Sequence, residues 1–181
     1  MIFVCNTGPL IALAKLDRLG LLQHLGGTSV FIPPMVYKEL WSKIGPEAPL
    51  IETALRTFIH LEQPGKIGPH VEIATASLDD GEREVIGLGT SLQEAVVLVM
   101  DDQAGRRVAK ELGLPVVGSA GLLLLAKQKG LIAEVYPLLE TLWLQGYWLS
   151  DAVLEKVRRL AGEYTTQGSA YDNPPDIPAL T

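Results

Sequence analysis

The chain has 181 residues, of which 48% are hydrophobic and 20% charged, with a formal net charge of -6 at pH 7. This composition is too apolar for a disordered chain and fits one folded domain. The negative balance argues against a protein that coats nucleic acid through bulk charge, so contact with a polyanion must use local basic clusters or bound cations. The single cysteine, Cys5, excludes an internal disulfide, which indicates a reducing, cytoplasmic location.

The first third of the chain predicts two strand–helix units. A β-prone run at residues 2–5 ends at Asn6, and a helix with apolar side chains at helical spacing follows through to Leu25. Residues 30–32 predict a second strand, and the helix that opens after Pro33-Pro34 carries Glu39 in its early turns. The pattern is weaker beyond, with a helix expected at residues 49–58 and then a loop rich in proline and glycine.

The second half predicts further strands and helices in alternation. A helix with acids in its first turn, Glu82 among them, is expected to run to about Ser91. The apolar run at residues 95–100 predicts a strand covered on both faces. The remaining elements expected are helix 103–112, strand 115–117, turn 118–120, helix 121–129 and amphipathic helices 132–145 and 151–163.

The predicted organisation is one α/β domain over residues 1–163, with the helices of residues 132–163 as a C-terminal extension. Residues 164–181 lack periodicity and are expected to form a disordered tail. Trp143, Tyr147 and Trp148 are interpreted as core or dimer contacts rather than a base-stacking platform. No apolar run reaches the roughly 20 residues that span a bilayer, so no membrane segment is expected.

Candidate metal ligands occur at strand ends and helix starts. Because parallel sheets form their sites outside the carboxyl ends of the strands, Asn6, Glu39, Glu82 and Asp101 are expected to meet at one edge. Carboxylates brought together repel one another, and Mg²⁺ or Mn²⁺ would supply the missing positive charge. Taken singly, each acid is better explained as a helix cap, a first-turn dipole partner or a surface charge, and only their joint occurrence at one sheet edge favours a metal site.

Five segments, read together, resemble the PIN domain. They are residues 6–13 (NTGPLIAL), 34–40 (PMVYKEL), 80–86 (DGEREVI), 101–109 (DDQAGRRVA) and 113–123 (GLPVVGSAGLL). The resemblance covers about residues 2–149 and is strongest to the prokaryotic branch related to toxin ribonucleases of the VapC type. It implies a three-layer α/β/α sandwich with a mostly parallel central sheet.

The resemblance also implies a metal-dependent endoribonuclease that binds RNA, is often a homodimer and is often neutralised by a small antitoxin. The family's metal-binding acids fall on Glu39, Glu82 and Asp101, with Asp102 as an adjacent alternative, and Thr7 matches a small hydroxyl residue. Asn6 departs from the pattern, because the family usually has Asp there. An amide keeps an oxygen ligand but gives up a negative charge, so a weak or lost activity is expected as readily as a full one.

Two further stretches have open interpretations. Arg106 and Arg107, with Lys110, are candidate contacts to an RNA backbone, the alternative being a solvated helix face. The turn at residues 118–121 is a weak sign of nucleotide binding at a helix N-terminus. The sequence therefore leaves three candidate functions: a ribonuclease, a non-catalytic PIN-like module that binds RNA or a protein partner, and a nucleotide-binding regulator.

Overall fold

The computed structural model describes residues 1–25, 29–147 and 149–163, so the tail expected at residues 164–181 lies outside the described residues. The described strands form one all-parallel sheet in the order β3-β2-β1-β4-β5. The strands are β1 (Ile2–Cys5), β2 (Ser29–Ile32), β3 (Ile59–Leu61), β4 (Val96–Val99) and β5 (Val116–Val117). The α/β class and the parallel sheet expected from the sequence are confirmed.

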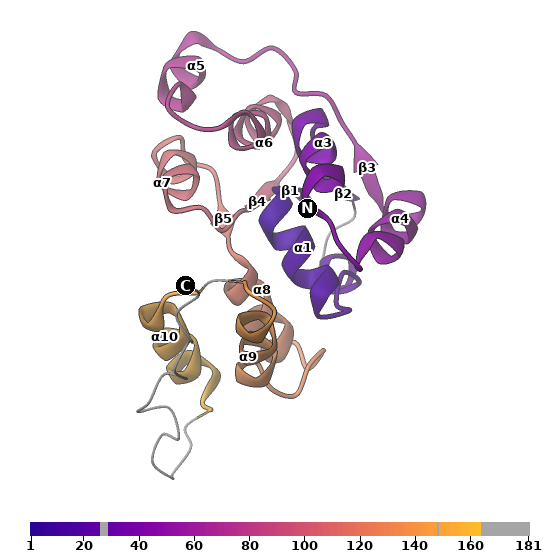
Figure 1. Ribbon diagram of the computed structural model, residues 1–181. Helices are drawn as coiled ribbons and strands as arrows, with labels where there is room; N and C mark the ends of the chain where they lie inside the picture. The colour runs from indigo at the N-terminus through magenta and orange to yellow at the C-terminus, as the bar shows by residue number, and fades with distance from the viewer. Residues whose placement is uncertain (26–28, 148, 164–181) are drawn as a thin grey trace, which may run out of the picture.

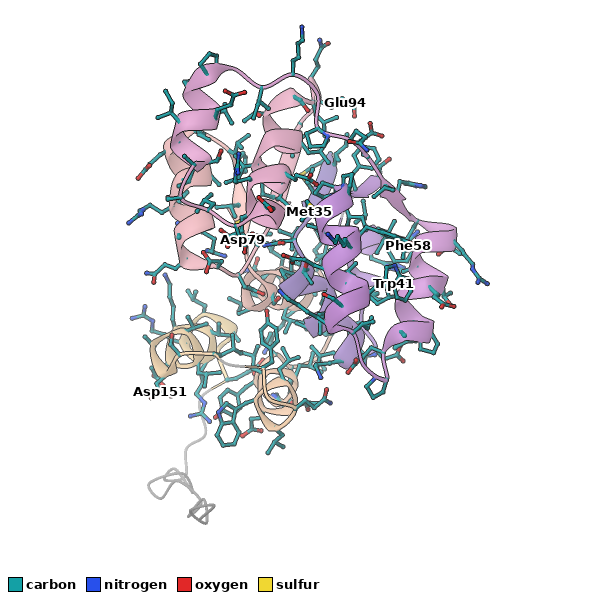
Figure 2. The ribbon with its side chains drawn as sticks, turned by 45° about the horizontal axis from the view of Figure 1, so that its top comes forward. Met35, Trp41, Phe58, Asp79, Glu94 and Asp151 are labelled. Carbon is teal, nitrogen blue, oxygen red and sulfur yellow. The ribbon has the colours of Figure 1, made fainter. Side chains whose placement is uncertain are left out.

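Helices cover both faces of this sheet (Figure 1). They are α1 (Thr7–Lys15), α2 (Leu21–His24), α3 (Pro34–Lys43), α4 (Ala48–Thr57), α5 (Pro69–Thr75), α6 (Asp80–Ser91), α7 (Gln103–Glu111), α8 (Ser119–Gln128), α9 (Tyr136–Leu144) and α10 (Asp151–Ala161). Helices α5, α6 and α7 lie together on one side, and α1 and α8 lie on the other. Helix α3 packs against both α1 and α6, and Figure 2 shows Met35 at its start, where the Met35 amide donates to the Glu84 carboxylate at 2.7 Å.

The centre of the sheet is where the strand order reverses. From β1 the chain adds β2 and β3 on one side, and it later places β4 and β5 on the other. Open α/β sheets bind ligands in the crevice outside the carboxyl ends of their strands, at such a switch point. The ends of β1 and β4, paired through Cys5 and Val99, therefore define where a site belongs.

The core explains why the central strands read as continuous apolar runs. All four residues of β1 are buried, and Leu98, Val99 and Met100 at the end of β4 are fully buried. Strands that are covered by helices on both faces bury side chains of both parities, so no alternation survives. Because these buried strands are held firmly in the core, the residues that follow β1 and β4 have fixed positions at the carboxyl edge of the sheet.

The C-terminal helices α9 and α10 lie beyond α8, away from the sheet (Figure 1). Glu163 ties them together, because its carboxylate accepts hydrogen bonds from the amides of Val135 and Tyr136, both at 2.7 Å, at the start of α9. The same carboxylate accepts from Lys127 Nζ of α8 at 2.6 Å. Helices α8, α9 and α10 therefore form one connected unit.

The prediction of a single helix from Leu10 to Leu25 is wrong, because the structure has two helices there, α1 and α2. Helix α1 ends at Lys15, and Asp17 adopts a left-handed conformation with φ of 54°. The amide of Arg18 donates to the Leu13 carbonyl and that of Asp17 to the Ala14 carbonyl, a Schellman closure without its usual glycine. Because no glycine or proline marks the stop, the apolar spacing alone predicted continuation.

Other differences concern short elements. The loop expected after residue 58 contains β3 and α5, whose three and seven residues are too short for a periodic signal. The turn expected at residues 118–120 is instead the start of α8, with Ser119 as its first residue. Helix α9 begins at Tyr136 rather than residue 132.

Candidate active site

The site begins at the end of β1, where Asn6 follows the last strand residue. The Asn6 amide nitrogen donates to the Val99 carbonyl at 2.9 Å, which ties the ends of β1 and β4 together. The Asn6 side-chain oxygen accepts from the Thr7 amide at 2.8 Å and caps α1. Asn6 is therefore placed at the switch point by the sheet and oriented by the helix that follows.

Thr7 and Glu39 connect α1 to α3. The buried Thr7 hydroxyl donates to Glu39 Oε2 at 2.7 Å, and Lys43 Nζ lies 3.6 Å from the same oxygen. The Glu39 carboxylate also lies against Gly81 in the first turn of α6, where an added Cβ would stand 3.2 Å from Oε1. A glycine at position 81 therefore allows Glu39 to approach the turn that carries Glu82.

Glu82 is the most unusual acid of the chain. Its side chain is buried, with 5% of the residue exposed, although it stands in the first turn of α6. Desolvation by burial, together with the charges of Asp79 and Asp102, raises its pKa from 4.5 to about 7. The Asp79 side chain, seen at the start of α6 in Figure 2, accepts from the Glu82 amide at 2.7 Å. The carboxyl groups of Asp79, Glu82 and Asp102 therefore lie close together at the start of α6.

Asp102 serves as the N-cap of α7. Its Oδ1 accepts from the amides of Ala104 at 2.7 Å and Gly105 at 3.0 Å. Desolvation opposes its charge, but hydrogen bonds from the Gly105 amide, the Glu82 side chain and the Ala104 amide outweigh it and lower its pKa. Of the two partners, Asp102 is the more acidic, and Glu82 is the one that carries a proton below about pH 7.

Asp101 faces in another direction from Asp102. Its Oδ1 accepts from the Ser119 amide at 2.8 Å, and its Oδ2 accepts from the Ser119 hydroxyl at 2.5 Å and from the Tyr147 hydroxyl. Burial and the neighbouring Asp101 charge raise the pKa of the Tyr147 phenol, which stays protonated as a donor. The N-terminus of α8, interpreted from sequence as a possible phosphate-binding turn, is thus used by a carboxylate of the chain itself.

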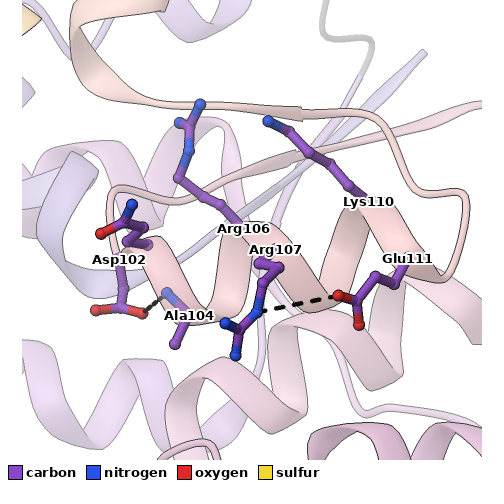
Figure 3. Close-up of a pocket in the computed structure, with 7 residues that line it drawn as sticks. Asp102, Ala104, Arg106, Arg107, Lys110 and Glu111 are labelled. Carbon is purple, nitrogen blue, oxygen red and sulfur yellow. Dashed lines mark hydrogen bonds and ion pairs between the residues drawn. The ribbon is translucent and has the colours of Figure 1, made fainter.

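The basic side chains of α7 border a surface hollow (Figure 3). This hollow is lined by Asp102, Gln103, Ala104, Arg106, Arg107, Lys110 and Glu111. Arg106 is half-buried and donates from Nη1 to the Met100 carbonyl at 3.1 Å, whereas Arg107 is exposed and lies 4.0 Å from Glu111. One guanidinium therefore braces the end of β4, and the other remains at the surface.

The structure brings the predicted residues to one edge but in separate groups. Glu39 joins Thr7, Glu82 joins Asp102, and Asp101 joins Ser119 and Tyr147. Within residues 1–25, 29–147 and 149–163, no three acids, histidines or cysteines gather closely enough to hold a metal ion. The donor chemistry nevertheless fits a hard cation, because Glu82 is buried beside other carboxylates and all candidate ligands are oxygens.

Sequence reasoning missed two members of this site. Ser119 is fully buried at the start of α8 and gives Asp101 two hydrogen bonds. Tyr147 was interpreted as a core or dimer contact, and its half-buried ring does pack on the core, but its hydroxyl reaches Asp101, 46 positions away. The Gly118-Ser119 pair after β5 is a local signal for a helix start, whereas no local signal marks the tyrosine.

The fold and the acidic edge define an α/β protein with a site at the switch point of a parallel sheet. A family model described as a PIN domain matches residues 2–163. The chain therefore belongs to the PIN domain family, whose members are generally nucleases that use divalent metals. A search of curated proteins finds no match. Within the described ranges, no helix combines the length and apolar character needed to cross a membrane.

Proposed function

We propose that this chain is a metal-dependent endoribonuclease that hydrolyses RNA phosphodiester bonds with Mg²⁺ or Mn²⁺. The observation that carries the proposal is the burial of Glu82 beside Asp79 and Asp102, at the edge where Asn6, Glu39 and Asp101 also emerge. A buried carboxyl with a raised pKa and a charged partner is a functional-site candidate. A nearby positive charge would favour its ionised form.

Glu39, Glu82 and Asp101 would hold the cation, with Asp102 and the Asn6 amide as further oxygen donors. When bound, such an ion supplies the Lewis acidity and positive charge that phosphodiester hydrolysis requires. The Thr7 hydroxyl would orient Glu39, to which it donates at 2.7 Å. Burial would keep Glu82 in a low-dielectric setting, where charges interact strongly.

The substrate side of the site would be formed by Thr7, Arg106 and Arg107. The basic side chains of α7 line a hollow that begins at Asp102, directly after Asp101. In a chain with a net charge of -6, such a local cluster is the feature that would attract a phosphate backbone. RNA would then lie along α7 with a scissile phosphate near the end of β4.

The test is cleavage of a fluorogenic single-stranded RNA with Mn²⁺ or Mg²⁺. We expect cleavage by the purified chain, loss of cleavage in Glu82→Gln and Asp101→Ala, and retention in Asp151→Ala, which removes an exposed acid from the first turn of α10. Cleavage that survives both site variants would contradict the proposal, because a contaminating nuclease would then explain it.

We further propose that the nuclease acts as a homodimeric toxin that a small antitoxin protein neutralises. This proposal rests on the family resemblance of the five segments quoted above. Induced expression should slow growth, and the Glu82→Gln variant should not. If cells that express an enzyme active in vitro grow normally, the toxin role is rejected and the proposed nuclease activity stands.

A non-catalytic PIN-like module that binds RNA or a protein partner is the second candidate. Two observations favour it: Asn6 is neutral, and the Asp101 carboxylate is already engaged by Ser119 and Tyr147. Calorimetry distinguishes the two functions. RNA binding without any Mn²⁺ binding at millimolar concentration would favour the module.

A further inference from the structure

Tyr147 lies in the segment that follows α9, and its side chain reaches the site at the sheet edge. Its hydroxyl donates to Asp101 Oδ2, and it lies 3.4 Å from the position that a Cβ on Gly8 would take in the first turn of α1. The phenol therefore stands between the start of α1 and the end of β4. These are the two segments that carry Asn6 and Asp101.

The hydrogen bonds to Asp101 leave its carboxylate little free capacity. A carboxylate has about four lone-pair positions. Three of them are used here, one by the Ser119 amide, one by the Ser119 hydroxyl and one by Tyr147. Both oxygens are thereby held toward α8, and Asp101 joins no group of three acids within the described residues.

We propose that Tyr147 is an inhibitory latch, which holds Asp101 toward α8 and keeps it from completing a cation site with Glu39 and Glu82. The inference rests on the proposed function, since it assumes that these acids bind a divalent metal. Asp101 can turn toward the other acids only after its bonds to Tyr147 and Ser119 break, and the Tyr147 hydroxyl supplies one of these three bonds. The C-terminal helices thus restrain the site.

The latch is set by the geometry of the end of α9. Gly146 has φ of 78°, a left-handed conformation that suits glycine, and the Tyr147 amide donates to the Leu142 carbonyl at 2.9 Å. This closure directs the ring back toward the sheet. Beyond it, α10 packs on α8 and α9, and Glu163 fixes the start of α9. A ligand that loosens this helical unit would release Asp101.

A supporting role for Tyr147 predicts the opposite effect of its removal. Side chains that hydrogen-bond to metal ligands usually strengthen metal binding, so losing such a support weakens it. A latch competes with the metal for Asp101, so losing it strengthens binding. The sign of the change in Mn²⁺ affinity therefore decides between the two roles.

The experiment is calorimetric titration of Mn²⁺ into the full chain and its Tyr147→Phe variant, which keeps the ring and removes only the hydroxyl. We expect about tenfold tighter binding in the variant, because a hydrogen bond to a charged acceptor no longer opposes Asp101. Tyr37→Phe, which removes an exposed phenol hydroxyl from α3, should leave the affinity unchanged. In a chain that already carries Asp101→Asn, Tyr147→Phe should no longer tighten Mn²⁺ binding. Melting curves will verify that each variant is folded.

Each other outcome overturns the latch in a recognisable way. Equal or weaker Mn²⁺ affinity in Tyr147→Phe, with RNA cleavage intact in the parent chain, rejects the latch and leaves the nuclease in place. A gain that persists with Asp101→Asn also rejects it, since Asp101 would not be the restrained group. No Mn²⁺ binding by any variant, together with no RNA cleavage, rejects both the latch and the proposed nuclease.

Discussion

The Thr7 hydroxyl donates a hydrogen bond of 2.7 Å to the Glu39 carboxylate, joining residues 32 positions apart. Thr7 is buried in the first turn of α1, so its donor has a fixed direction. Glu39 is in turn pressed against Gly81 at the start of α6. This hydrogen bond and the contact with Gly81 together link three helices around the end of β1, and the acids of the site depend on this packing.

Glu82 should make folding stability depend on pH. Its pKa is about 7 in the folded chain, above its ordinary 4.5, so between these values the folded chain binds more protons than the unfolded chain. Its contribution to the free energy of unfolding therefore falls as pH rises from about 4.5 to 7 and is constant above that. The free energy of unfolding of Glu82→Gln should therefore exceed that of the parent chain by on the order of 1–3 kcal/mol at pH 8, and the two should be equal at pH 4.5.

Urea denaturation with EDTA present, from pH 4.5 to 8, measures this difference. Glu72→Gln, an exposed acid in the first turn of α5, is the matched control and should show no such trend. If the difference in free energy of unfolding between the parent chain and Glu82→Gln is the same at pH 4.5 and pH 8, the raised pKa assigned to Glu82 is contradicted.

Asn6→Asp should strengthen metal binding. The added negative charge lies at the switch point, and Asp caps a helix as well as Asn does, so α1 should keep its start. We expect roughly tenfold or more tighter Mn²⁺ binding, and faster RNA cleavage, because hard cations favour anionic oxygen ligands. Gln23→Glu makes the same charge change at an exposed site on α2 and should change neither quantity. If Asn6→Asp behaves like this control, Asn6 does not face the cation.

Arg107→Gln should weaken RNA binding about equally for all sequences. Arg107 is exposed in the hollow of Figure 3 and its ion pair with Glu111, at 4.0 Å, is long. Loss of one phosphate contact should lower the slope of log affinity against log salt by about 0.7 for a single strand. Fluorescence anisotropy at several salt concentrations measures this slope. Arg56→Gln removes a similar ion-paired arginine, 3.8 Å from Glu52 on α4, and an equal effect there would indicate bulk charge alone.

Glu163→Gln should destabilise the C-terminal helices. Burial opposes the charge of Glu163, but hydrogen bonds from Lys127 and from the amides of Val135 and Tyr136 outweigh it and lower its pKa. Its stabilisation is therefore present above the ordinary pKa of a glutamate and is lost as pH falls through the lowered value. We expect a loss of roughly 1–3 kcal/mol at pH 7 by urea denaturation. Glu155→Gln, exposed on α10, is the control, and equal losses in both variants would show that Glu163 has no special role.

Much of the site could be located from the sequence because its residues follow local signals. Asn6 ends a strand, Glu82 opens a helix, and Asp101 ends an apolar run, so a parallel sheet places them at one edge. The orientation of each carboxylate could not be read in the same way. Asp101 and Asp102 are neighbours in the chain, yet the first bonds to Ser119 and Tyr147 and the second caps α7.

The sequence by itself determined strands β1, β2, β4 and β5 and their alternation with helices, the all-oxygen character of the candidate ligands and the neutral Asn6, because these follow from local periodicity and residue chemistry. The tertiary structure decided the burial of Glu82, the Thr7–Glu39 bond and the contact of Tyr147 with Asp101. It also ended α1 at Lys15 through a left-handed Asp17. The physical reason is that desolvation and hydrogen bonding between distant residues depend on packing, which no local pattern encodes.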